Sequence, residues 1–159
     1  MDGSGIKTIS QDAVKTQKQQ GILDIVIAYD GMFSNNLFLG FGSATYLDGS
    51  KYSGHWENSQ RHGMGRLEFS TNYYYHGSFR NNRYHGRGLL EHVVEENDND
   101  LEPEISLLKV VNYIEKHGGN YRGDFYYGVA CGFGILTTSS GKQIKGVFKN
   151  DKLLNPFSE

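Results

Sequence analysis

Alternation of aromatic residues, glycine and polar residues marks the middle of the chain. Tyr52, Gly54 and Trp56 stand two residues apart, and the residues between them, Ser53 and His55, are polar. Because alternate residues of a β-strand point to the same face, this pattern predicts a strand with one aromatic face and one polar face. The glycine between two aromatic residues leaves a gap, over which a ring from a neighbouring strand can lie.

The same pattern recurs at a fixed interval of 23 residues. A second copy begins at Tyr75, and further copies start at Tyr29, at Tyr121 and, with isoleucine in place of tyrosine, at Ile144. A fixed period of about 20–50 residues indicates a repeat array. Two periods separate Tyr75 from Tyr121, and the motif positions of the intervening period fall on acidic residues. We therefore interpret part of this interval as an insertion.

Each copy contains two predicted strands joined by a turn. Asn58-Ser59-Gln60 and Asn81-Asn82-Arg83 favour turns, because asparagine tolerates a positive φ. A Gly-x-Gly element such as Gly63-Met64-Gly65 opens the return strand, where glycine permits a bend. Since one hairpin is too small to be stable, the hairpins must stack. The predicted fold is all-β: one elongated, single-layer antiparallel sheet of about four and a half hairpins, with about ten strands.

The segments outside the repeats divide the chain further. The predicted array spans residues 22–154, with an apolar strand at 22–28 and an insertion at 95–116. Residues 1–21 are polar, which indicates a flexible or partner-ordered arm or, alternatively, a short helix that begins at Ser10. Residues 155–159 form a C-terminal tail.

The segment at 107–115 is compatible with two kinds of element. Pro103 before it and Gly118 after it favour a helix. Its β-branched residues, such as Val110 and Val111, favour a strand. An array of hairpins needs an even number of strands in each unit, so the segment either completes the interrupted return strand or forms a helix beside it.

Composition and charge narrow the function classes. Lys and Arg number 16 against 18 Asp and Glu, and the resulting net charge of −2 gives no electrostatic argument for nucleic acid or an anionic membrane. No apolar run approaches the roughly 20 residues of a transmembrane helix, and residues 1–20 contain no apolar stretch typical of a signal peptide. We expect a cytoplasmic protein. Cys131 is the single cysteine, which excludes an internal disulfide and a cysteine-based zinc site.

The histidines do not indicate catalysis or metal binding. His62 and His85 occupy equivalent repeat positions, and two histidines alone make a poor metal site. The other four histidines are scattered, and the sequence contains no recognisable nucleophile–base pair. We predict a non-enzymatic protein with no metal and no cofactor.

The repeated pattern, Tyr-x-Gly-x-Phe/Trp-x-Asn followed by His-Gly-x-Gly, resembles the MORN repeat. The fullest copy consists of Tyr52, Gly54, Trp56, Asn58, His62, Gly63 and Gly65. The resemblance covers residues 29–94 and 118–152. Leu39 and Cys131 replace the motif histidine, and the insertion has no counterpart in the motif.

The resemblance implies an open sheet that curves into a groove and works as a scaffold or adaptor. It suggests a cytoskeletal or ciliary assembly and a protein partner. A peripheral, phospholipid-binding module is a weaker alternative implied by the family. A targeting array attached to an enzyme is a third, but this chain has no room for an enzyme domain.

The aromatic face is the predicted partner site. Aromatic surface that an open sheet leaves exposed is a candidate interaction patch, and Trp and Tyr are favoured in interface hot spots. The rings can also pack on one another across the sheet, and the two interpretations are compatible. An extended or helical peptide of a partner, residues 1–21 or the insertion would lie there. The predicted groove consists of Tyr29, Phe33, Tyr52, Trp56, Tyr75, Phe79, Tyr121 and Phe125.

Opposite charges gather in two neighbouring stretches. Residues 91–104 hold seven acidic residues and no basic one, which indicates a solvated loop; the spacing excludes a calcium loop, because Pro103 and Lys109 fall where Gly and Glu are required. Residues 61–87 hold five arginines against Glu68 alone. We hypothesise that the acidic insertion folds back over this basic edge, or that a charged partner bridges the two. The candidate electrostatic edge comprises Arg61, Arg66, Arg83 and Arg87.

Overall fold

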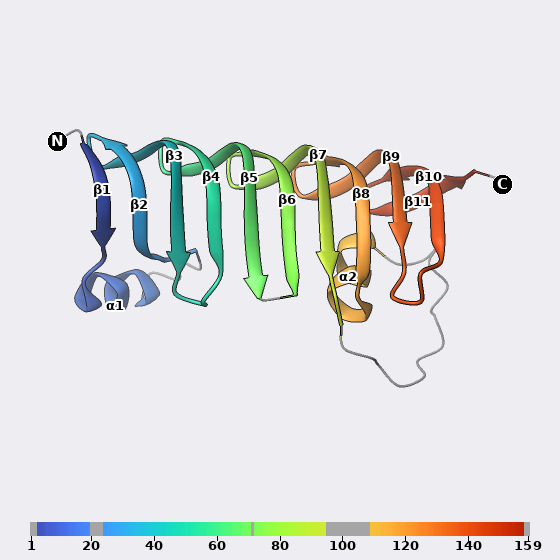
Figure 1. Cartoon of the computed structure of the whole chain (residues 1–159), viewed down its shortest axis with the longest axis horizontal. Coiled ribbons are helices and arrows are strands. Elements are labelled where there is room, and N and C mark those ends of the chain that lie inside the picture. The colour runs from blue at the N-terminus through green and yellow to red at the C-terminus, as the bar shows by residue number, and fades with distance from the viewer. Residues whose placement is uncertain (1–2, 20–23, 71, 95–108, 158–159) are drawn as a thin grey trace.

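The computed structural model shows one elongated antiparallel sheet whose spatial strand order is the chain order. It describes residues 3–19, 24–70, 72–94 and 109–157. The two ends of the chain lie at opposite ends of the sheet (Figure 1). The prediction of an all-β sheet of stacked hairpins is confirmed, with 11 strands where about ten were expected. The elements are β1 (Gly3–Thr8), α1 (Gln11–Gln19), β2 (Val26–Ser34), β3 (Leu37–Tyr46), β4 (Lys51–Glu57), β5 (Gln60–Ser70), β6 (Tyr73–Arg80), β7 (Arg83–His92), α2 (Val110–His117), β8 (Gly119–Tyr126), β9 (Val129–Thr137), β10 (Gln143–Lys149) and β11 (Lys152–Pro156).

Two-residue turns with positive φ close the hairpins. Asn58 and Ser59 have φ values of 49° and 60°, and Asn81 and Asn82 have 49° and 66°. Two consecutive positive φ values define the turn type whose twist matches that of paired strands. The side chain of the second turn residue also bonds the preceding hairpin, since Arg61 N donates to Asn82 Oδ1 at 2.8 Å. The asparagine-rich turns therefore close each hairpin and fasten it to its neighbour.

The two glycines of each Gly-x-Gly element have different structural roles. Gly63 has φ +60°, a left-handed conformation that favours glycine, and the β4–β5 register shifts there between Gly54 and Trp56. Gly65 pairs with Gly54, and a Cβ at Gly65 would stand 2.3 Å from Tyr52 Oη. The ring of Tyr52 thus lies over Gly54 on its own strand as well as over Gly65 on the neighbouring strand. One tyrosine fills both gaps.

Within the segment predicted to be a flexible or partner-ordered arm at 1–21, the described residues form a strand and a helix. β1 pairs with β2 in the register Lys7↔Tyr29 and becomes the edge strand of the sheet. The free backbone edge of β2 explains this pairing, because an exposed edge accepts another strand. α1 follows, and Ser10 Oγ accepts a hydrogen bond from Ala13 N at 3.3 Å, as in the helix predicted to begin at Ser10.

Residues 110–115 of the segment that sequence left open between helix and strand are helical and belong to α2. Val110, Tyr113 and Ile114 are buried on one side of α2, which packs against β7, β8 and β9 (Figure 1). The helix ends at His117, and the φ of 74° at the following residue, Gly118, favours glycine at a helix C-terminus. Residues 95–108 lie outside the described residues.

The last repeat is a complete hairpin. β10 pairs with β9 and with β11, and the latter pairing reaches Pro156. Phe157 N still donates to Lys145 O at 2.9 Å. This corrects the boundary predicted for the C-terminal tail: residues 155–157 belong to the edge of the sheet. Pro156 at this position is compatible with an edge strand, which needs fewer backbone donors.

Candidate functional site

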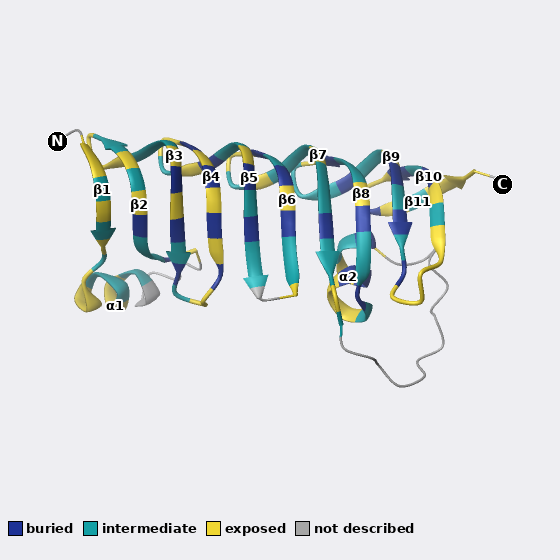
Figure 2. Ribbon diagram, in the orientation of Figure 1, coloured by how far each residue is buried: buried dark blue, intermediate teal, exposed yellow. Residues whose placement is uncertain are grey.

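Seven of the eight aromatic residues predicted to line a partner-binding groove are buried, which corrects that prediction. Each of the seven has at most 4% of its surface exposed. Buried bands cross the strands in Figure 2. Phe33, at the β1 end, is half-buried, with Lys7 Nζ 3.5 Å from its ring centroid. The buried members are Tyr29, Tyr52, Trp56, Tyr75, Phe79, Tyr121 and Phe125.

These rings form a continuous ladder through the sheet, the aromatic ladder. Neighbouring rings meet edge to face, with centroids 5.0–5.5 Å apart and interplanar angles of 79–89°. Such pairs contribute about 0.5–1.5 kcal/mol each beyond their burial. In order the ladder is Tyr29, Trp56, Tyr52, Phe79, Tyr75, Phe125, Tyr121 and Phe148. The ladder is a core, and we call its side of the sheet the aromatic face.

The ladder tyrosines direct their hydroxyls to the backbone. Tyr52 Oη donates to His55 O and Tyr75 Oη to Ser78 O, each at 2.9 Å, three residues along the same strand. Burial raises the pKa of both phenols. Neutral, hydrogen-bonded hydroxyls satisfy the requirement that buried polar groups be paired, and these bonds fix the orientation of the rings.

Arg61 is an exception within the aromatic face. Its side chain is buried and donates through Nη2 to Asp24 Oδ2 at 3.0 Å, with its guanidinium 5.3 Å from the Tyr46 centroid. The equivalent residues of the neighbouring hairpins are Phe38 and Tyr84, which stack on the ladder tyrosines at 3.8 and 3.9 Å. An arginine therefore occupies a position built for a ring.

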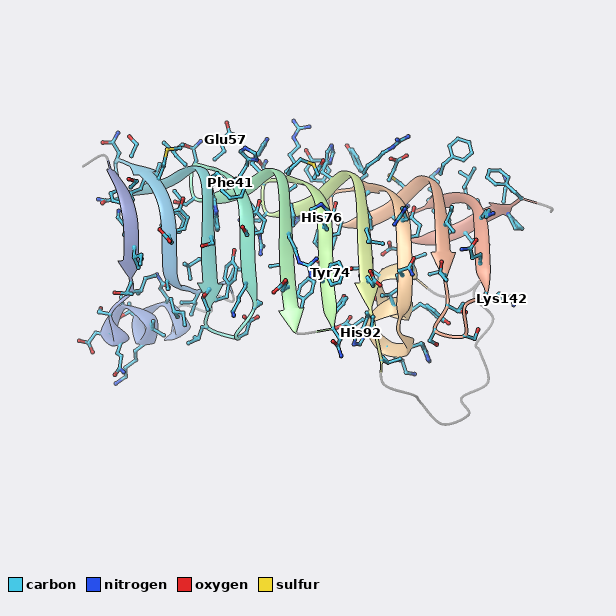
Figure 3. The ribbon with its side chains drawn as sticks, viewed as in Figure 1. Phe41, Glu57, Tyr74, His76, His92 and Lys142 are labelled. Atoms are coloured by element: carbon cyan, nitrogen blue, oxygen red, sulfur yellow. The ribbon has the colours of Figure 1, made fainter. Side chains whose placement is uncertain are left out.

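The opposite face of the sheet, which we call the groove face, exposes the residues that alternate with the ladder. The central residue of each Gly-x-Gly element lies there and differs between repeats. Phe41, Met64 and Phe133 have 60%, 50% and 67% of their surface exposed, and the Arg87 side chain has 94%. Figure 3 labels Phe41 and, near the middle of the sheet, His76. Large exposed apolar side chains on a polar surface indicate an interaction site.

A groove of about 720 Å³ runs across this face from β5 to the end of the sheet. The paired glycines form part of its floor, including Gly77, Gly88, Gly123 and Gly134. Met64 lies at one end, and Phe133 and Phe157, with centroids 5.6 Å apart, lie at the other. The groove is open and elongated, which suits a length of chain better than a small molecule.

The charges along the groove are predominantly positive. Arg87, Arg122 and Lys145 line it, and all three are exposed. Asp124 is the acidic residue among its lining residues, and Arg87 Nε lies 3.7 Å from Asp124 Oδ1. This exposed pair largely cancels its own charge, which leaves Arg122 and Lys145 to set the sign of the local potential.

The four arginines of the predicted electrostatic edge do not form one edge. Arg66 and Arg87 lie on the groove face, where Arg66 Nε donates to Glu68 Oε1 at 2.8 Å. Arg61 is buried and pairs with the exposed Asp24, and Arg83 is exposed beside Arg61 at a separate cavity of about 260 Å³. The strand period separates Arg61 from Arg66, because residues an odd number apart on one strand, here β5, face opposite ways. Residues 95–108, which hold most of the acidic residues proposed to cover this edge, lie outside the described residues.

Sequence reasoning missed the groove residues Arg122, Phe133, Lys145 and Phe157. A signal was present: Phe41, Met64 and Phe133 stand between glycines at the same repeat position. That position alternates with the ladder, so large apolar residues there must face away from the core.

Within the described part of the chain, no three side chains among His, Cys, Asp and Glu gather as metal ligands would. Cys131 is half-buried, and burial raises the pKa of its thiol, which favours the less reactive protonated form. Neither described helix is long and apolar enough to cross a bilayer.

Comparison with protein families gives a direct match. A family model described as MORN repeat matches residues 29–51, 52–72, 75–91 and 121–143, just over half of the chain. The matches begin at the tyrosines that open β-hairpins on the aromatic face. A comparison with curated proteins found no match.

Proposed function

The chain belongs to the MORN-repeat family, a non-catalytic repeat type often involved in protein or membrane interactions, and from that premise we propose that it is a scaffold or adaptor. In this proposal it binds an extended segment of a partner protein in the groove of the groove face. The partner site therefore moves from the aromatic residues predicted by sequence to the opposite side of the same strands.

The supporting observation is the exposed aromatic pair Phe133 and Phe157 at one end of a groove floored by glycine backbone. Aromatic anchors in a depression are the usual centres of protein interfaces. Glycine in the floor lets another backbone approach closely. The buried ladder beneath holds the groove rigid, so the groove loses little conformational entropy when a partner binds.

We also propose that the protein works within a cytoskeletal or ciliary assembly in the cytoplasm, because it resembles MORN-repeat scaffolds. A phospholipid headgroup is the other ligand class associated with such arrays. We favour the protein partner because the chain has a net charge of −2, which an anionic bilayer surface does not attract.

Affinity capture with matched variants tests the proposal. The full chain is compared with the double variant Phe133→Ser/Phe157→Ser and with Phe41→Ser, which changes the same Gly-x-Gly position outside the groove. We expect a stoichiometric protein partner that the wild type and Phe41→Ser retain and the double variant loses. Retention by all three chains, with circular dichroism unchanged, would contradict the groove proposal.

Co-sedimentation with phosphatidylserine vesicles separates the lipid alternative. We expect the chain to stay in the supernatant at physiological salt. Sedimentation that the double variant loses and Phe41→Ser keeps would assign the groove to lipid instead.

A further inference from the structure

One row of the groove alternates cationic and apolar side chains from strand to strand. The row runs through His76 on β6, Leu89 on β7, Arg122 on β8, Ile135 on β9 and Lys145 on β10. Each residue is the direct cross-strand partner of the next, in the pairs His76↔Leu89, Leu89↔Arg122, Arg122↔Ile135 and Ile135↔Lys145. We call it the alternating row. Its imidazole and two cations therefore occupy every second strand.

Strand geometry fixes the spacing of these groups. Neighbouring strands lie about 4.8 Å apart, so Arg122 and Lys145, two strands apart, stand about 9.6 Å from each other at the backbone, as do His76 and Arg122. Both cations are exposed, and the single acid in the groove, Asp124, already faces Arg87. Arg122 and Lys145 thus present two positive groups about 9.6 Å apart along the groove, and the imidazole of His76 stands one such interval beyond Arg122.

A polyproline II helix has the matching period. It rises about 3.1 Å per residue with three residues per turn, so side chains three residues apart stand about 9.3 Å apart on one side. An extended β-strand has a same-face spacing of about 6.6 Å, which does not fit. Apolar residues between the acids would meet Leu89 and Ile135, which are half-buried in the row.

We propose that the groove binds a linear peptide segment in the polyproline II conformation, with acidic residues at every third position and apolar residues between them. This inference rests on the proposed function and names the chemistry of its partner. The carboxylates bind Arg122 and Lys145, with His76 beside a third, and an apolar residue beyond the last acid packs against the exposed rings of Phe133 and Phe157.

Fluorescence anisotropy with three defined peptides tests the proposal. The first is a fluorescein-labelled, proline-rich nonapeptide with glutamates at positions 1, 4 and 7 and leucines between them. The second has the same composition with its three glutamates adjacent. The third has lysines in place of the glutamates. We expect the first to bind the full chain about tenfold more tightly than either other peptide, a difference of the size that complementary charges produce.

Charge reversal gives the matched variants. Arg122→Glu/Lys145→Glu should weaken binding of the glutamate nonapeptide about tenfold or more and should bind the lysine peptide better than the wild type does. Arg80→Glu/Arg83→Glu makes the same change in net charge outside the groove and should bind like the wild type. All four residues are exposed, and circular dichroism checks that each variant folds.

Equal binding of the spaced and adjacent isomers, or equal loss in both charge-reversed variants, would overturn the inference. If no peptide binds but the Phe133/Phe157 variant still loses a captured protein, the peptide chemistry is wrong and the proposed function stands. If neither peptide binding nor that loss occurs, both fail.

Discussion

The aromatic face and the groove face are built from the same strands. They differ in how much the residue types at equivalent positions vary from one repeat to the next. Along β4 the exposed fraction alternates residue by residue, with Tyr52 and Trp56 buried and Ser53 and His55 exposed. On the aromatic face every hairpin supplies a tyrosine or its equivalent and a second ring. On the groove face the equivalent Gly-x-Gly positions hold phenylalanine, methionine, arginine and phenylalanine in turn.

This difference indicates where stability and specificity reside. Ring contacts between hairpins require the same residue types in each copy, because each ring packs against the next copy. The groove face has no such constraint, so its residues are available to distinguish partners. Binding is therefore expected where the repeats differ, and folding where they agree.

The largest expected effect is on the aromatic face. Tyr75→Ala removes a fully buried ring that contacts Phe79, Tyr84 and Phe125, and should lower the free energy of unfolding by about 3–5 kcal/mol. Phe133→Ala, on the groove face, should change it by less than about 0.5 kcal/mol. Urea denaturation of both variants makes the comparison. Similar losses in the two would mean that the faces do not divide these roles.

A glycine pair sharpens the contrast within one Gly-x-Gly element. Gly88→Ala would place a Cβ 2.4 Å from Tyr75 Oη and should cost about 3 kcal/mol, the upper end of overpacking, because that ring is fully enclosed. In Gly86→Ala the new Cβ would lie 3.5 Å from Ser78 Cβ, an ordinary contact. Only the φ of +69° disfavours alanine there, and we expect it to lower the free energy of unfolding by about 1 kcal/mol. Thermal denaturation should rank them in that order. The reverse order would show that the positive φ at Gly86, where the strand register shifts, requires glycine more strictly than the contact of Gly88 with the Tyr75 ring does.

Arg61 tests how far the aromatic face tolerates an exception. Arg61→Tyr restores the residue type of Tyr84 and should leave stability unchanged or raise it by about 1 kcal/mol, since a ring can stack on Tyr52 where a buried charge now needs Asp24. Arg61→Ala, which leaves a void, is the control and should be less stable than both. Chemical denaturation measures the three chains. A Tyr variant as unstable as the Ala variant would mean that the Asp24 ion pair is required.

The smallest expected effect concerns the turn that fastens the last hairpin. Ala130 N donates to the buried Asp151 Oδ1 at 2.5 Å, and burial raises the pKa of this carboxyl above its usual 3.8. The native state therefore binds its proton more tightly than the unfolded state, so stability is lost as pH rises from about 3.8 through the raised value.

Asp151→Asn keeps the amide oxygen as acceptor and removes this titration, and asparagine occupies the equivalent position at Asn82. We expect the variant to be slightly more stable than the wild type at neutral pH, with the difference disappearing below pH 3.8. Thermal unfolding midpoints of the variant and the wild type, measured over a range of pH, test this expectation. A difference that persists at low pH would assign the effect to packing instead of charge.

Much of the fold follows from local sequence. The 23-residue period, the strand alternation around Tyr52 and Trp56, and the asparagine turns each specify a hairpin by short-range rules, and each agrees with the structure. The N-terminal strand β1 does not follow from them. Its Gly- and Lys-containing sequence has no strong strand preference, and it becomes a strand because the edge of β2 offers it unsatisfied backbone groups.

The candidate site was predicted less well than the fold, for a reason visible at Tyr52. Alternation shows that Tyr52 and Trp56 share a face, but it does not show which face becomes the interior. The sequence by itself determined the repeated hairpins and, around Tyr52 and Trp56, which residues share a face. Only the tertiary structure decided that the rings of one face close over the paired glycines and one another. That packing turns the predicted binding strip into a core and leaves Phe133, Arg122 and their neighbours as the accessible surface, because burial depends on contacts between hairpins and not on the order of residues within one.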